Sequence, residues 1–154
     1  MDRIDRNILR VLMQDGQTTN AKLAKTIGLS ESATLERVRR LEQSGVIRGY
    51  TALVEPERVD RGLEILMTFS LKNQGADEVR RFIDAMQSMV EVLSCAQTLG
   101  RFDFVAHVAV RDVAALQHFI DEKILSLGSI NHMESLTILK MVKRWQPPLP
   151  LDEE

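Results

Sequence analysis

The sequence predicts an α+β protein in which an all-helical N-terminal part precedes a part built of strands and helices. Two observations support this prediction. Apolar residues recur with a helical period in three stretches between residues 4 and 43, whereas strand-like apolar runs alternate with helical stretches between residues 63 and 142. The chain has 154 residues, of which 44% are hydrophobic, so it can bury a core in one ordinary domain or in two small ones.

The first two helices are predicted from apolar stripes with turn residues at their ends. Residues 4–14 form the first helix, which Asp15-Gly16 ends, and Thr19 or Asn20 caps a second helix that runs to Ile27. The residues expected to pack are Ile4, Ile8, Leu9, Val11 and Leu12 in the first helix and Ala21, Leu23, Ala24 and Ile27 in the second. Gly28 then supplies the tight turn into the next helix.

A third helix is expected between Ser30, which stands where an N-cap belongs, and Gly45, which stands where a helix stops. Its apolar stripe contains Leu35, Val38 and Leu41, with Thr34 turned toward the same packed side. The opposite side presents Ser32, Glu36, Arg39, Arg40 and Gln43, with Ala33 and Arg37 beside them. The apolar-polar run from Val46 to Val54 that follows predicts a strand.

Two short helices joined by a glycine turn, the second with basic residues outward, are typical of a helix-turn-helix that enters the DNA major groove. The charge agrees, because residues 1–50 carry nine Lys and Arg against six Asp and Glu, a net charge of +3, whereas the whole chain carries −2. A solvated surface is the competing interpretation of any arginine-rich helix face, and the combination of helices, turn and following strand favours DNA.

We expect contacts to base edges or adjacent phosphates from Ser32, Ala33, Glu36, Arg37 and Arg40, and contacts to phosphates from Arg39 and Arg48. Glu36 has a second interpretation, an ion pair within the helix with Arg39 or Arg40. Tyr50 is expected to pack against the connection between the domains and not to stack on a base.

Residues 55–62 are charged and contain Pro56 and Gly62, which indicates a linker. Beyond this linker the order strand, helix, strand occurs twice. The strands are expected at 63–72, 90–98, 102–110 and 130–142, and the helices at 76–88 and 113–126. This order predicts a ferredoxin-like βαββαβ domain, in which helices cover one face of a four-stranded sheet.

The second face of this sheet is expected to be covered as well, because the strands are apolar on both sides. In the first strand Leu66 alternates with Ile65 and Met67, and in the third strand Val105 alternates with Phe104. A two-fold dimer that packs sheet against sheet would bury this face and would pair two DNA-reading helices.

Short motifs along the chain occur in an order and spacing that is similar to a known family: Asp2, Asp5-Arg6, Ile8-Leu9, Leu23-Ala24, Gly28-Leu29-Ser30, Arg37-Val38, Arg40-Leu41-Glu42, Gly45-Val46-Ile47, Gly49-Tyr50 and Gly100-Arg101-Phe102-Asp103. Together they resemble the leucine-responsive/asparagine regulators, the Lrp/AsnC family of prokaryotic transcription regulators. The resemblance spans essentially the whole chain. It implies an amino-acid effector, dimers formed through the ferredoxin-like domain, and further assembly into octamers.

On that resemblance, the effector site is lined by Thr98, Leu99, Gly100, Arg101, Phe102 and Asp103, together with Leu136, Thr137 and Ile138 of the last strand. Asp103 can accept hydrogen bonds from an ammonium group and Arg101 can pair with a carboxylate. The competing interpretations are a hairpin turn at Gly100 that Asp103 caps, and a core position for the last-strand residues. The family often has Thr or Ser where this chain has Leu99, which favours an unusual or apolar effector, or none.

No catalytic residue, cofactor or metal site is expected. The three histidines, His107, His118 and His132, have no metal-ligand spacing with one another or with Cys95. There is no glycine-rich phosphate loop and no nucleophile motif. The single Cys95 lies in an apolar-rich segment and is expected to be a buried structural thiol.

The sequence therefore predicts a helix-turn-helix DNA-binding domain at 1–54, a linker at 55–62, a ferredoxin-like effector-binding and oligomerisation domain at 63–143, and a C-terminal tail at 144–154. We expect a cytoplasmic regulator without a membrane partner, because no apolar run is long enough to span a bilayer. Its expected partners are double-stranded DNA, an amino acid or related small molecule, and further copies of itself. The alternatives are an effector-independent architectural DNA-binding protein and an amino-acid-sensing subunit that docks on a protein.

Overall fold

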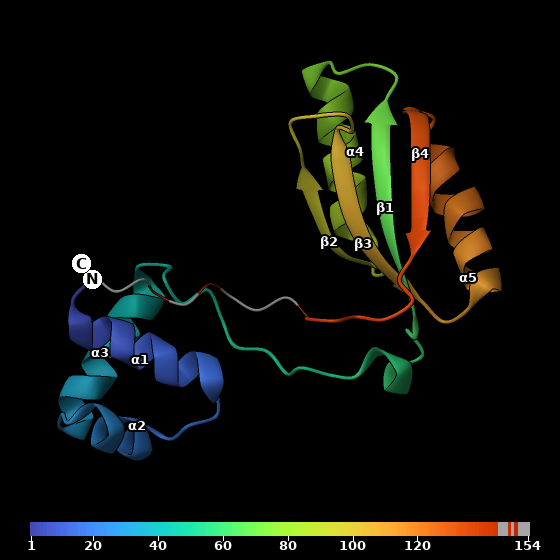
Figure 1. Cartoon of the computed structure of the whole chain (residues 1–154). Helices are drawn as coiled ribbons and strands as arrows, with labels where there is room; N and C mark the ends of the chain where they lie inside the picture. The colour runs from blue at the N-terminus through green and yellow to red at the C-terminus, as the bar shows by residue number, and fades with distance from the viewer. Residues whose placement is uncertain (145–147, 149, 151–154) are drawn as a thin grey trace. The chain divides into compact units, whose positions relative to one another are not determined.

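The computed structural model describes residues 1–144, 148 and 150, so most of the tail predicted at 144–154 lies outside the described residues. One compact unit contains Met1–Leu53 and the other contains Val54–Val142 (Figure 1). Among the described helices, none combines the length and the apolar character needed to cross a bilayer.

The N-terminal unit contains three helices, as the sequence predicted: α1 at Arg3–Gln14, α2 at Asn20–Ile27 and α3 at Glu31–Gln43. Each begins at a side-chain cap, which accepts a backbone N–H of the first turn. These caps are Asp2, Thr19 and Ser30. The helices close over a small aliphatic core of Ile8, Leu9, Leu23 and Leu41.

Three details of the N-terminal prediction are wrong. Ala21 is exposed, and so is Leu35, which keeps 39% of its surface accessible. Thr34 occupies the centre of the packed side instead, fully buried, and its hydroxyl donates to the carbonyl of Ser30 at 2.9 Å. Residues 46–54 form no strand, because no other described segment pairs with them.

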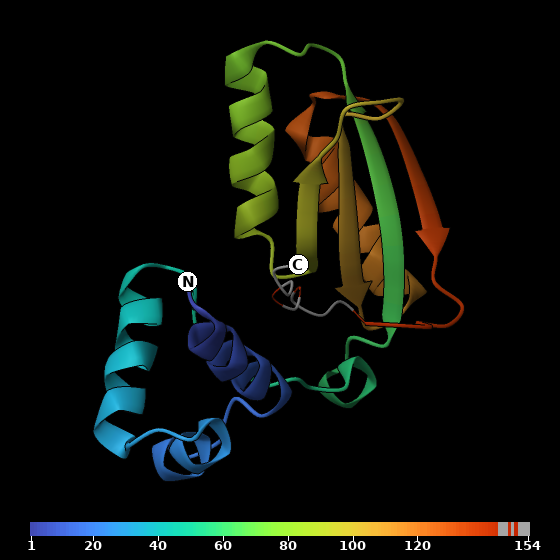
Figure 2. The same cartoon turned by 60° about the vertical axis from the view of Figure 1, so that its left-hand side comes forward.

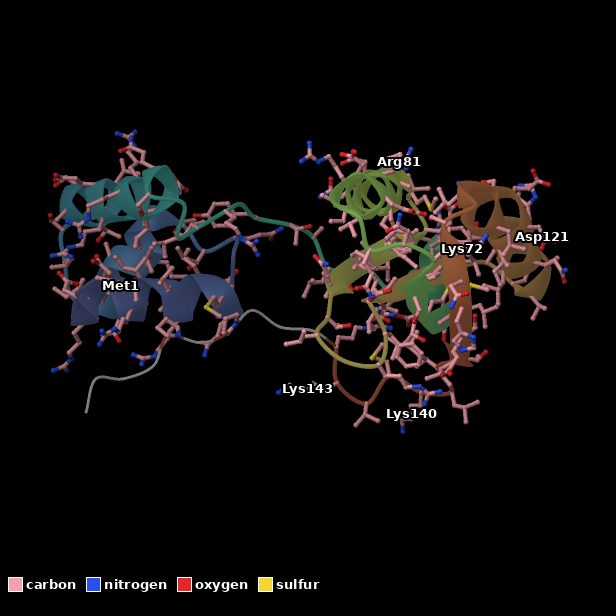
Figure 3. The ribbon with its side chains drawn as sticks, turned by 90° about the horizontal axis from the view of Figure 1, so that it is seen from above. Met1, Lys72, Arg81, Asp121, Lys140 and Lys143 are labelled. Atoms are coloured by element: carbon pink, nitrogen blue, oxygen red, sulfur yellow. The ribbon has the colours of Figure 1, made fainter. Side chains whose placement is uncertain are left out.

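The C-terminal unit contains the expected order of strands and helices: β1 at Leu63–Leu71, α4 at Ala76–Ser88, β2 at Val92–Gln97, β3 at Phe104–Val110, α5 at Val113–His118 and β4 at Ile130–Thr137. Three short helical turns accompany them: a 3-10 turn η1 at Pro56–Val59, a π-helical turn η2 at Phe119–Ile124 and a 3-10 turn η3 at Leu125–Leu127. The strands form one antiparallel sheet in the order β2-β3-β1-β4. Helices α4 and α5 lie on the same face of this sheet (Figures 1 and 3). The predicted fold class is confirmed.

The core between the sheet and its helices is rich in aromatic side chains. Phe69, Phe82, Phe104 and Phe119 are each 1% exposed or less. The ring of Phe82 lies 5.4 Å from that of Phe69 and 4.6 Å from that of Phe104, spacings typical of packed aromatic pairs. This cluster fixes α4 against the middle of the sheet.

Three details of the C-terminal prediction are wrong. The last strand ends at Thr137 and not at residue 142. Thr137 pairs with Ile65, and one more hydrogen bond follows, from the N–H of Ile138 to the carbonyl of Glu64. The helix predicted at 113–126 changes to a π-helical turn after His118. Cys95 is exposed, since it lies on β2, an edge strand.

The second face of the sheet, which α4 and α5 do not cover, is open in this unit (Figure 2). Strand pairing places Leu66 of β1 opposite His107 of β3 and Leu136 of β4, so these three side chains share this face. Glu64 is also on it, with its carboxylate 3.0 Å from the imidazole of His107. We refer to this surface as the open sheet face.

Candidate functional site

The outward side of α3 brings together most of the residues that the sequence singled out for DNA. A shallow hollow follows this side of the helix, and its lining includes every predicted contact residue except Arg48. Ser32, Glu36 and Arg39 are exposed along it, and so is Leu35, which the sequence had placed in the core. The surface therefore combines hydroxyl, carboxylate, guanidinium and methyl groups, the kinds of group that contact base edges and phosphates.

The start of α3 is fixed by the backbone conformation of Gly28 and by two hydrogen bonds. Gly28 adopts φ +75 in the left-handed region, which lets α2 end and the chain turn within three residues. The Ser30 hydroxyl accepts from the N–H of Ala33 at 3.3 Å, and the Asn20 amide donates to the carbonyl of Glu31 at 2.8 Å. These contacts fix the N-terminal turn of α3, the part of a recognition helix that approaches the bases.

A group of four charged side chains joins α3 to α1, and we call it the α1–α3 ion cluster: Asp2, Asp5, Arg37 and Arg40. One guanidinium nitrogen of Arg37 donates to Asp2 at 2.7 Å and to Asp5 at 2.8 Å. One nitrogen of Arg40 lies 3.1 and 3.0 Å from the two carboxylate oxygens of Asp5. Two arginines that the sequence assigned to DNA are therefore bound within the unit.

The carboxylates of this cluster are also part of the start of α1. Asp2 accepts from the N–H of Asp5 at 2.8 Å, and Asp5 accepts from the N–H of Asp2 at 3.2 Å, which is a capping box. The N–H of Asp5, together with Arg37, lowers the pKa of Asp2 below its ordinary value. Hydrogen bonds to Asp2 and Asp5 raise the pKa of Arg37, so Asp2 and Arg37 are both charged near neutral pH.

Sequence reasoning missed the role of Asp2 and Asp5 at this surface. The spacing of the two aspartates indicates a capping box, but their pairing with Arg37 joins residues more than thirty positions apart. No local pattern predicts such a contact. Arg40 pairs with Asp5, and among the described residues no ion pair joins Glu36 to Arg39 or Arg40, the pair that the sequence allowed. Tyr50 lies near α3, where its hydroxyl donates to Glu42 at 3.0 Å.

The loop between β2 and β3 contains the residues that the sequence assigned to an effector. It closes as a hairpin, in which the N–H of Thr98 donates to the carbonyl of Asp103 at 2.8 Å and the Thr98 hydroxyl donates to the carbonyl of Phe102. Leu99 at the tip is fully exposed. Gly100 has no positive φ, so the turn does not require its conformational freedom.

Asp103 fastens this loop to the end of β1. One carboxylate oxygen accepts the N–H of Leu71 at 2.7 Å, and the other accepts the side-chain amide of Gln74 at 2.8 Å. Its own N–H donates to the carbonyl of Phe69 at 2.9 Å. The carboxylate of Asp103 therefore binds the end of β1 and the segment before α4, and not its own hairpin turn, so the local cap that the sequence allowed is not the contact that this side chain makes.

Arg101 and Phe102 lie beside β4. The Arg101 guanidinium forms an ion pair with Glu134 at 3.2 Å and lies 5.0 Å from the centre of the Phe102 ring. That ring stacks on His132, with the ring centres 6.4 Å apart. The sequence did not single out His132 or Glu134 as neighbours of the loop, because only the pairing of β4 with β1 brings them there.

The last-strand residues of the predicted effector site are accessible. Leu136 is 56% exposed and Thr137 is exposed, so the core interpretation is wrong for both, whereas Ile138 is half-buried. Among the described residues, no three His, Cys, Asp or Glu side chains are arranged to hold a metal ion.

Comparison with known proteins agrees with both units. Residues 1–48 match a winged helix-turn-helix DNA-binding model, and residues 64–148 match the Lrp/AsnC ligand-binding domain. The leucine-responsive regulatory proteins of Escherichia coli K12 and Klebsiella pneumoniae are each 38% identical over 144 residues, which cover 94% of this chain and 88% of theirs. A transcriptional regulator of Neisseria meningitidis, solved as its L-Met complex, has a TM-score of 0.91 and 33% identity and covers 99% of this chain and 97% of its own.

An AsnC-family transcriptional regulator of Agrobacterium tumefaciens gives a TM-score of 0.90 at 30% identity, with 97% of each chain covered. The fold, the helix-turn-helix and these similarities define a DNA-binding transcriptional regulator, and the proteins that it matches are regulators and not enzymes. The chain belongs to the Lrp/AsnC family.

Proposed function

We propose that this regulator binds duplex DNA through the outward side of α3 as a homodimer, and that an amino acid acting near the β2–β3 loop changes its assembly or its DNA affinity. The observation that carries the DNA part is the exposed polar side of a helix whose N-terminal turn is fixed by Gly28, Asn20 and Ser30. Ser32, Ala33 and Glu36 on this side contact base edges, and Arg39 and Arg48 contact phosphates.

Binding to DNA is tested by fluorescence anisotropy with duplex from upstream of the protein's own gene and with scrambled duplex. Arg39→Ala should weaken binding about 3- to 10-fold at moderate salt and reduce the slope of log K against log salt by about 0.9, because one phosphate contact is lost. The matched control is Arg81→Ala, an exposed arginine on α4 in the other unit (Figure 3), which should leave both quantities unchanged.

Absence of binding at low salt contradicts this proposal. Equal affinity for the two duplexes identifies the architectural alternative, in which the protein binds many sequences without discrimination.

An amino acid is the proposed effector because the Neisseria meningitidis relative was solved with L-Met. The free carboxylate and ammonium of an amino acid suit a loop that carries Arg101 and lies beside Glu134 and His132. A thermal-shift series with L-methionine, L-leucine and the other amino acids should raise the melting temperature in proportion to the logarithm of ligand concentration. Arg101→Ala should abolish the shift, and no shift with any amino acid contradicts this part of the proposal.

Dimerisation is proposed because the open sheet face carries the apolar side chains Leu66, Val105 and Leu136 without a covering helix. Sedimentation velocity should detect dimers or larger even-numbered assemblies, octamers among them, and Leu66→Glu should shift the protein toward monomer. A monomeric protein at micromolar concentration contradicts the proposal.

A further inference from the structure

We propose that Asp2 and Asp5 act as internal counter-charges for the recognition helix, which hold Arg37 and Arg40 and so limit attraction to DNA of arbitrary sequence. This inference rests on the proposed DNA interface of α3. It assigns to α1 a role in specificity that is separate from its packing, because the first turn of α1 sets how much positive charge α3 presents.

The contacts of the α1–α3 ion cluster support this counter-charge role. A phosphate attracts a guanidinium through the same charged, planar pairing as a carboxylate does. Here the charge is already paired, because one nitrogen of Arg37 bridges two carboxylates and one nitrogen of Arg40 contacts both oxygens of Asp5. The aspartates thus supply the anionic partner that a DNA phosphate would otherwise offer.

The cluster contains two positive and two negative charges, so its formal net charge is zero. Binding to DNA without sequence preference depends on the number of phosphates that free cations neutralise. Within the described part of the unit, no ion pair with a carboxylate is found for Arg39 or Arg48, whereas Arg37 and Arg40 are compensated. Of the four arginines that the sequence assigned to DNA, two are therefore compensated by carboxylates and two are not.

The two compensated arginines differ in exposure, and for this reason we assign different roles to them. The Arg37 side chain is 25% exposed and its partner Asp5 only 3%, so this pair holds α3 against α1 and Arg37 is a positioning residue. The Arg40 side chain is 61% exposed. Arg40 can leave Asp5 for a phosphate that lies at the right place, and a poorly placed phosphate does not compensate for the lost pairing.

The test uses Asp2→Asn, because Asn caps a helix as well as Asp does. The substitution preserves the cap and leaves Arg37 bound to Asp5, and it changes the cluster from neutral to a charge of +1. The matched control is Asp15→Asn in the same unit. The side chains of Asp2 and Asp15 are 51% and 47% exposed, and each substitution removes one ion pair, with Arg37 or with Lys22.

Anisotropy titrations with scrambled duplex are compared at several salt concentrations, after thermal melting confirms that both variants are folded. Asp2→Asn should bind scrambled duplex up to about eightfold more tightly at about 0.1 M salt and steepen the salt slope by up to about 0.9. Asp15→Asn should give less than half of either change. Equal effects of the two variants, or no change with Asp2→Asn, would overturn the inference.

The Arg39→Ala measurement separates the two proposals. If Arg39→Ala weakens binding while Asp2→Asn has no effect, the DNA interface stands and the counter-charge role fails. If neither variant changes affinity, the interface on α3 fails as well.

Discussion

The two units of this chain are held together in different ways. The sheet unit has a core in which four phenylalanines pack between the strands and their helices. The N-terminal unit contains no Phe or Trp in residues 1–53, and its buried cluster consists of Ile8, Leu9, Leu23 and Leu41. It adds the α1–α3 ion cluster, in which the Asp5 side chain is only 3% exposed.

Because of this difference, the same residues contribute to stability and to the proposed function in the smaller unit. In the sheet unit the core residues and the loop residues near Arg101 are separate sets. In the helix-turn-helix unit, Arg37 belongs to the proposed DNA surface and also to the contacts that hold α3. Loss of DNA binding after a substitution there is therefore informative only when stability is measured as well.

The largest effect is expected from Phe82→Ala in the aromatic core. Removal of a ring that is 1% exposed leaves a cavity and should lower the free energy of unfolding of the sheet unit by about 4 kcal/mol. Hydrogen exchange with peptide-level mass spectrometry should show faster exchange in β1, β3 and α4, with α1 to α3 unchanged. Faster exchange in all helices alike would show that the two units do not unfold separately.

The next effect is expected from Asp5→Ala in the ion cluster. The substitution removes a buried acceptor of Arg37 and Arg40 together with half of the capping box, and should lower the stability of the N-terminal unit by about 3 kcal/mol. The same exchange experiment should localise the loss to α1 and α3. The control Asp5→Asn keeps one acceptor oxygen and should lose less, and an unchanged α3 would show that the aliphatic core suffices.

The sequence predicted the helices of both units because their signals are local. The helix at Ala76–Ser88 was placed at its observed bounds from the spacing of Val79, Phe82, Ile83 and Met86. The cap Ser30 was predicted, and the cap Thr19 was one of the two candidates for the second helix. The candidate DNA surface followed from the same helical period.

The wrong or missing predictions concern features whose structure depends on a partner that is distant in the sequence. The apolar-polar run after Gly45 has no strand to pair with among the described residues, and the end of β4 is set by its pairing with Ile65 of β1. The side-chain partners of Arg37 and of Asp103 lie about thirty residues away or more. Local sequence patterns therefore predict neither the ion cluster nor the contacts of Asp103 with the end of β1.

A smaller effect is expected from Asp103→Ala in the β2–β3 loop. The variant loses the acceptors of the Leu71 N–H and of the Gln74 amide, which should lower stability by about 1.5 kcal/mol and speed exchange at the end of β1. The control Glu134→Ala removes the solvent-accessible contacts with Arg101 and His132 and should cost less than about 0.5 kcal/mol. Equal losses in urea denaturation would contradict the structural role of Asp103.

The smallest effect compares one backbone position from each unit, Gly28 and Gly128. Both have a left-handed φ, +75 and +66, and a Cβ added at either meets no atom within 4 Å, so Gly→Ala introduces backbone strain alone. Each substitution should therefore lower stability by about 1 kcal/mol, measured by urea denaturation. Only Gly28→Ala should also weaken binding to the upstream duplex, because Gly28 sets the turn that aims α3. If both variants bind DNA like the original chain, the direction of α3 does not depend on this turn.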